Sequence, residues 1–143
     1  MKVLLLIGRI MYSLIFILAV LGHFKSGVIQ YAAMKGVPAA NILVPASGVL
    51  AMLGGVLIAL GYKAKVGGWL LVIFLVPVTL TMHAFWKETD PLAIQMQTMN
   101  FIKNIALLGT ALLICWFGAG PLSLDELAQK KEKHQKEYEE QAR

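Results

Sequence analysis

Charged residues and cysteine are both scarce in this chain. Only 15% of its 143 residues are charged and a single one, Cys115, is a cysteine, whereas soluble domains carry about 25% charged residues. The low charge excludes an ordinary soluble globule. One cysteine excludes an intrachain disulfide, a CxxC redox pair and the four thiolates of an iron–sulfur cluster. No acid occurs between Lys2 and Lys87, which disfavours a stand-alone ion-driven transporter, because such proteins place Asp or Glu within the membrane.

Hydrophobic residues are abundant instead and occur in long blocks. They make up 58% of the chain, and its mean hydropathy is +0.70. About 20 helical residues cross a bilayer core about 30 Å thick, and the backbone of such a segment must be helical to satisfy its hydrogen bonds in lipid. We therefore predict an all-α integral membrane four-helix bundle in residues 1–120, embedded in a lipid bilayer, with spans Val3–Phe24, Ile42–Leu60, Val66–Phe85 and Met99–Phe117.

Two further helices are predicted outside the spans. The connection Lys25–Asn41 contains a short run that favours an interfacial helix, ended by the Gly36-Val37-Pro38 sequence. Residues 121–143 form a separate charged tail. Its capping box pairs Ser123 as the N-cap with Glu126 as the N3 residue, so we predict a solvated helix there.

The placement of basic residues predicts the orientation. The net charge is +5, but the bases separate hydrophobic runs rather than forming a stripe with aromatics, so nucleic-acid binding is not expected. By the positive-inside rule we expect a multi-pass protein of the cell (inner) membrane with both termini in the cytoplasm. The inner side would then hold Lys2, Arg9, Lys63, Lys65, Lys130, Lys131, Lys133, Lys136 and Arg143, and the outer side Lys25, Lys35, Lys87 and Lys103.

The second span carries small residues at every fourth position. Ser47, Ala51, Gly55 and Ala59 form a stripe that allows another helix to approach closely. We interpret the stripe as packing within the bundle, and a homo-oligomer through helix packing is the alternative.

Polar side chains gather where the third span ends and the fourth begins. In a continuous third helix, Thr79, His83, Trp86 and Lys87 would share one face, and this end would meet the start of the fourth span at the outer face. The set suits a planar ligand with a polar head, such as a quinone, whose reduction takes up protons near a titratable group. The alternative is an interfacial belt of anchors and helix–helix contacts. The predicted outer-face cluster consists of His83, Trp86, Gln97, Asn100, Lys103 and Asn104.

Two further polar residues, Arg9 and His23, fall within the first predicted span. Arg9 lies about 10 Å into the first span, and a structural side chain that snorkels to the surface is favoured over a contact to a quinone or a ligand phosphate. His23 and His83 both fall at outer helix ends, where they are possible haem ligands. A haem site is disfavoured, because His23 directly precedes Phe24-Lys25, as expected of an interfacial histidine. No other metal site is predicted.

Several short motifs together resemble the DoxX family of small four-helix membrane proteins. The resemblance covers roughly residues 5–120, and it departs from the family at Ala51 and Met52, where many members carry a glutamate. The motifs are Leu6-Ile7-Gly8-Arg9, Lys35-Gly36-Val37-Pro38, Leu53-Gly54-Gly55 with Leu60-Gly61, His83-Ala84-Phe85-Trp86, and the stretch from Gln95-Met96-Gln97 through Asn100-Phe101-Ile102-Lys103-Asn104 to Gly109.

The resemblance implies a quinone-linked role or a role beside a soluble redox-protein partner. On this reading the chain is at most the membrane subunit of an oxidoreductase. His83 would exchange protons as the catalytic residue and Trp86 would pack on the ring, while the amides, Lys103 and Arg9 would serve in ligand binding. A non-catalytic scaffold or assembly factor is the alternative, and a small carrier of lipophilic molecules is a third.

Overall fold

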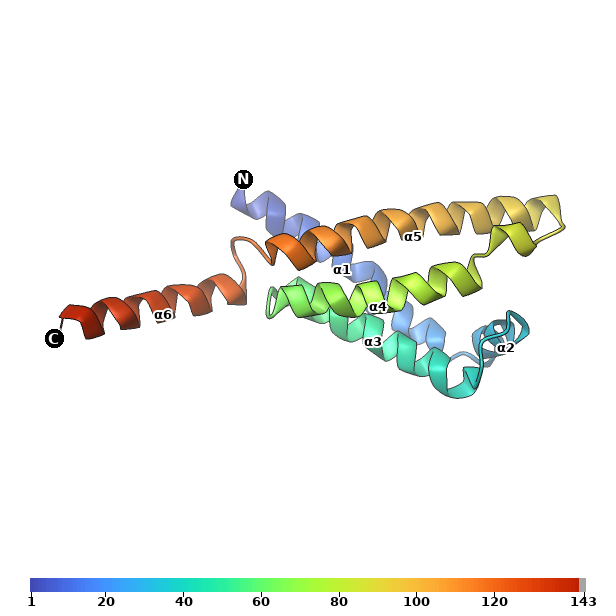
Figure 1. Cartoon of the computed structure of the whole chain (residues 1–143), viewed down its shortest axis with the longest axis horizontal. Coiled ribbons are helices and arrows are strands. Elements are labelled where there is room, and N and C mark those ends of the chain that lie inside the picture. The colour runs from blue at the N-terminus through green and yellow to red at the C-terminus, as the bar shows by residue number, and fades with distance from the viewer. Residues whose placement is uncertain (142–143) are drawn as a thin grey trace.

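The computed structural model describes residues 1–141, which form six α-helices and one 3-10 turn with no strand among them (Figure 1). The described range leaves out the last two residues of the tail, including Arg143. Four of the helices are long and apolar enough to cross a membrane, so the predicted all-α membrane architecture is confirmed. The elements are α1 (Lys2–His23), α2 (Ser26–Met34), α3 (Ala40–Leu60), α4 (Ala64–Met82), η1 (Phe85–Lys87), α5 (Pro91–Phe117) and α6 (Leu124–Gln141).

The long helices pack in the order α1, α3, α4 and α5. Because they run alternately up and down, the N-terminus and α6 lie at the same end of the molecule (Figure 1). We call this the tail end. The opposite end, which holds α2, η1 and the start of α5, is called the distal end. The structure thus agrees with two termini on one side of the membrane, while which side that is stays a prediction.

Glycines allow the helices to approach closely at three seams. A Cβ on Gly55 of α3 would lie 3.1 Å from the carbonyl oxygen of Ser13 in α1. A Cβ on Gly67 of α4 would lie 2.9 Å from the carbonyl oxygen of Gly54 in α3, and one on Gly68 would lie 2.8 Å from Cys115 Sγ in α5. The small-residue stripe of α3 therefore faces α1 at Gly55, as expected for packing within the bundle.

The core between these helices is aromatic and aliphatic. Ile58 and Leu71 are fully buried, and Phe16 meets Phe74 edge to face with ring centroids 6.3 Å apart. Across the bundle, the Tyr12 hydroxyl donates to the Leu107 carbonyl oxygen at 2.9 Å, which ties α1 to α5.

The ends of the third and fourth spans differ from prediction. The helix of the third span ends at Met82 rather than Phe85. The fourth helix begins at Pro91, eight residues before Met99, where Asp90 caps it by accepting from the Ala93 amide at 2.8 Å. At 27 residues, α5 is about 40 Å long and so exceeds the apolar thickness of about 30 Å. Its first turns therefore extend past the hydrophobic part of the span.

The helices predicted in the first connection and in the tail are confirmed. α2 ends at Met34, and Gly36 follows with φ at +86°. At the tail end, Ser123 caps α6 by accepting from the Glu126 amide at 3.1 Å. The Glu126 carboxylate accepts from the Leu122 amide at 2.8 Å, and its hydrogen bonds to Lys130 and to this amide hold the pKa of Glu126 below its usual range.

Candidate functional site

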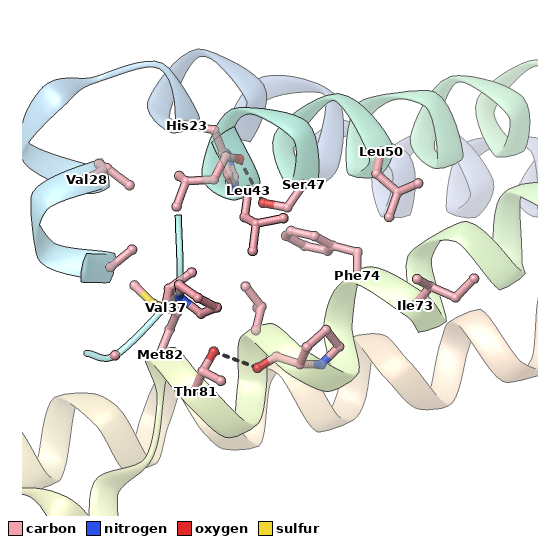
Figure 2. Close-up of a pocket in the computed structure, with 16 residues that line it drawn as sticks. His23, Val28, Val37, Leu43, Ser47, Leu50, Ile73, Phe74, Thr81 and Met82 are labelled. Carbon is pink, nitrogen blue, oxygen red and sulfur yellow. Dashed lines mark hydrogen bonds between the residues drawn. The ribbon is translucent and has the colours of Figure 1, made fainter. Parts of the chain in front are cut away.

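A cavity of about 340 Å³ opens at the distal end, between α2, α3 and α4 and the last residue of α1 (Figure 2). Aliphatic and aromatic side chains such as Val44, Leu50 and Phe74 form most of its wall. Its polar side chains come from three different helices. They are His23 of α1, Ser47 of α3 and Thr81 of α4.

His23 reaches the cavity because α3 leaves room for it. A Cβ on Gly48 would lie 2.6 Å from His23 Cβ, so only glycine at this position allows the imidazole to pack there. The ring sits 5.9 Å from the Phe74 ring. His23 Nδ1 lies 2.9 Å from the Ala19 carbonyl oxygen. A carbonyl only accepts, so Nδ1 carries a hydrogen and the neutral ring has its free lone pair on Nε2.

The two hydroxyls of the cavity bond to the backbone of their own helices. Ser47 Oγ donates to the Val44 carbonyl oxygen at 2.8 Å, and Thr81 Oγ1 donates to the Pro77 carbonyl oxygen at 2.7 Å (Figure 2). Pro77 itself has no N–H, so the Ile73 carbonyl loses its usual helical donor. Ser47 and Thr81 thus line the cavity with hydroxyl groups whose hydrogens are directed to the backbone.

Two polar contacts hold α2 across the distal end. Lys35, just after α2, forms an ion pair with Glu88, just after η1. This hydrogen bond raises the pKa of Lys35 above its ordinary value. Gln97 of α5 donates to the Tyr31 hydroxyl of α2 at 2.9 Å. Together with the packing of Ala32 on α3, these contacts fix α2 as one wall of the cavity.

The structure brings part of the predicted outer-face cluster together. His83 Nδ1 lies 2.8 Å from Gln97 Oε1, so the expected meeting of the third and fourth spans at this point is confirmed. The single helical face predicted from Thr79 to Lys87 is wrong, because α4 ends at Met82 and η1 takes a different path. Thr79 is buried and donates to the Leu75 carbonyl oxygen.

The other members of that cluster make separate contacts. Trp86 packs edge to face on Phe101 with centroids 5.8 Å apart. Lys103 donates to Asn100 Oδ1 at 3.0 Å, and that bond is exposed, whereas Asn104 is buried. None of the residues predicted to bind a ligand lines the described cavity. Ligand binding by the outer-face cluster stays a prediction.

Arg9 is held inside the protein rather than directed to solvent. The residue is only 7% exposed, and its guanidinium donates to three backbone carbonyls at the tail end. The acceptors are Ala59 at 3.3 Å, Ala119 at 2.8 Å and Leu122 at 2.8 Å. The prediction that it snorkels is wrong, because the turn before α6 folds over α1 and supplies acceptors that hydropathy does not reveal. Arg9 lies far along the bundle from the cavity and has a structural role.

Next to Arg9, an acid closes the turn between α3 and α4. Asp125 accepts from the amides of Lys63 at 2.7 Å and Ala64 at 3.0 Å, and its own amide donates to the Gly61 carbonyl at 2.8 Å. The first turn of α6 therefore caps the start of α4 and fixes the tail helix to the bundle.

The polar residues of the cavity were not predicted as a site. The sequence patterns favour packing for Ser47 and an interfacial position for His23, and they do not single out Thr81. The sequence carries two local signs of these polar positions. Ser47 and Gly48 are adjacent in the second span, and Pro77 lies four residues before Thr81 in the third. What joins them to His23 is the packing of α1 and α4 against α3, which no local pattern predicts.

Known proteins match most of the chain. A family model described as DoxX matches residues 4–84. The chain is similar to the inner membrane protein YphA of Escherichia coli (strain K12), with 32% identity over 127 residues that cover 86% of this chain and 89% of that protein. No solved structure matched the chain. Together with the four apolar helices, these matches show a multi-pass inner membrane protein. The chain belongs to the DoxX family.

Proposed function

We propose that this protein is a membrane subunit that binds a quinone or a similar amphiphile in the distal cavity and supports an oxidoreductase partner. The cavity carries the proposal. Its volume of about 340 Å³ falls within the range of about 300–1,000 Å³ of small-molecule sites, which are mostly apolar with a few placed polar groups. An aromatic head suits the wall around Phe74, and an apolar tail can leave along the membrane helices.

His23 supplies the titratable group of this site. It is half-buried at the cavity wall, and the bond from Nδ1 to the Ala19 carbonyl oxygen fixes the orientation of the ring. In the neutral ring, Nε2 is available to hold a proton for a bound head group. A quinone supplies two-electron chemistry when bound. The electrons would come from a soluble redox protein, because a chain with one cysteine has no dithiol of its own.

The experiment is a binding titration of the purified protein in nanodiscs with a decyl-substituted benzoquinone and its hydroquinone. We expect saturable binding that Ser47→Phe abolishes, because the new ring occupies the cavity. Thr110→Phe is the matched control: Thr110 is also half-buried and also donates to a helical carbonyl, that of Ala106 at 3.2 Å, but it lies outside the cavity lining. Equal binding by wild type and Ser47→Phe would refute the cavity as the site.

The predicted outer-face cluster is the second candidate, and the His83–Gln97 hydrogen bond favours it. Combining His83→Ala with Lys103→Met removes its titratable group and its charge. If this double variant loses binding while Ser47→Phe keeps it, the cluster is the site. If no ligand binds in any form, the scaffold or assembly-factor alternative is favoured. Co-purification of a soluble redox protein would support a partner role over a carrier of lipophilic molecules.

A further inference from the structure

The polar side chains around the distal cavity share one property: each donates its hydrogen to a backbone carbonyl of the protein. Ser47 Oγ and Thr81 Oγ1 donate theirs to the carbonyls of Val44 and Pro77. A hydroxyl has one hydrogen and two lone pairs, so each oxygen can still accept but has no hydrogen left to donate.

The imidazole follows the same rule. His23 Nδ1 donates to the Ala19 carbonyl oxygen, and a neutral ring carries only one N–H. Moving that hydrogen to Nε2 would set two lone pairs against each other across 2.9 Å. In the neutral state, His23 therefore presents an acceptor at Nε2.

The backbone of the wall adds no donor at the loop that follows α2. The amide of Gly36 donates to Ala33 and the amide of Val37 donates to Ala32, both at 3.0 Å, and Pro38 has no N–H. Among the described residues that line the cavity, the side chains of His23, Ser47 and Thr81 thus offer lone pairs without a free hydrogen.

We infer that the distal cavity selects a head group that donates hydrogen bonds, and so takes the hydroxyl-bearing, reduced form of an aromatic amphiphile, a hydroquinone, in preference to the quinone. This rests on the proposed function and names the form of its ligand. A quinone carbonyl only accepts. To bond it, a wall hydroxyl must give up its bond to the backbone, which exchanges one hydrogen bond for another. A hydroquinone hydroxyl adds a bond and breaks none.

The size of the preference follows from this difference of one hydrogen bond at each contact. A net hydrogen bond changes an equilibrium constant by roughly 2- to 10-fold. With two hydroxyls on the ligand, the hydroquinone is expected to bind about 4- to 100-fold more tightly than the quinone. Selection by hydrogen-bond donors is then separable from selection by shape, because methyl ethers of the same ring keep the apolar body and lose the donors.

The test compares three ligands of nearly equal shape: 2-decyl-1,4-hydroquinone, its 1,4-benzoquinone and its dimethyl ether. They are titrated anaerobically into the full-length protein in nanodiscs by calorimetry at neutral pH. We expect the hydroquinone to bind most tightly, and the quinone to bind no more tightly than the ether. Tighter or equal binding of the quinone relative to the hydroquinone would overturn the inference while leaving the proposed function intact. If none of the three binds, both are overturned together.

A pair of threonine variants tests whether the acceptors cause the preference. Thr81→Val keeps the shape and removes the hydroxyl oxygen from the cavity, so the hydroquinone should bind roughly 2- to 10-fold more weakly and the ether unchanged. Thr79→Val is the matched control, because Thr79 also donates to a carbonyl four residues earlier, at 2.6 Å, and is buried outside the cavity. An equal effect of both variants on hydroquinone binding would show that Thr81 is not an acceptor for the ligand.

Discussion

Replacing Gly55 by leucine tests how α1 and α3 pack. A Cβ on Gly55 would lie 3.1 Å from the Ser13 carbonyl oxygen, 3.1 Å from Ile17 Cγ1 and 3.2 Å from Phe16 Cβ. The nearest polar atom belongs to the backbone, so a change of rotamer cannot move it away. A leucine brings three more carbons into the same seam, and the two helices must separate.

The expected loss is about 2–3 kcal/mol in the free energy of unfolding, the upper part of the range for overpacked cores. Gly109→Leu is the matched control, because a Cβ at Gly109 of α5 meets nothing within 4 Å. Both variants gain similar helix propensity, so their difference isolates the packing term. Unfolding in SDS titrations, followed by circular dichroism, measures it. Equal stability of the two variants would refute the seam between α1 and α3.

Two further perturbations address the ends of the bundle. Arg9→Met leaves the carbonyls of Ala119 and Leu122 without this donor and should lower the free energy of unfolding by at least about 2 kcal/mol. SDS titration measures that loss, and limited proteolysis should also show faster cleavage between α5 and α6; wild-type cleavage in a stable variant would contradict the structural role. At the distal end, the pKa of Lys35 is higher in the folded protein than its ordinary value because of the hydrogen bond to Glu88. The pair therefore stabilises the fold fully at a pH below the ordinary lysine pKa, and this stabilisation is lost as the pH rises through the raised pKa. The midpoint temperature of thermal unfolding should therefore fall more over that alkaline window in wild type than in Glu88→Gln. Parallel pH profiles of the two proteins would refute the coupling.

The helices themselves could be predicted, but their ends could not. Runs of apolar residues longer than a bilayer core leave the backbone no alternative to a helix, so four spans followed from hydropathy. The start of α5 was missed because residues 91–98 include Gln95, Gln97 and Thr98, which lower the hydropathy although they are compatible with a helix. The better signal was local: Asp90-Pro91 supplies an N-cap and a first helical residue that needs no donor.

The cavity lay beyond sequence reasoning for a different reason. Its wall joins residues from α1, α3 and α4 that are far apart in the chain, and α2 supplies a further wall. The outer-face cluster, in contrast, was assembled from residues near one turn. His83 and Gln97 did meet, at 2.8 Å, because a short connection keeps them close. The assumption that failed was a continuous helix through His83, since that residue is the C-cap of α4.

The two ends of the bundle show why a polar residue in a membrane span is not by itself a sign of function. Arg9 is charged and buried, yet each of its three hydrogen bonds ends on a backbone carbonyl of the same chain, so these bonds tie the tail end together. His23, Ser47 and Thr81 are less conspicuous in the sequence, but each keeps a lone pair beside an apolar cavity. In a low-dielectric setting a lone pair without a partner is costly, and a bound hydroxyl removes that cost. A site is therefore better judged by the bonding capacity left after the protein's own groups have paired, and this is the reason that we propose the cavity, rather than Arg9, as the place for a ligand.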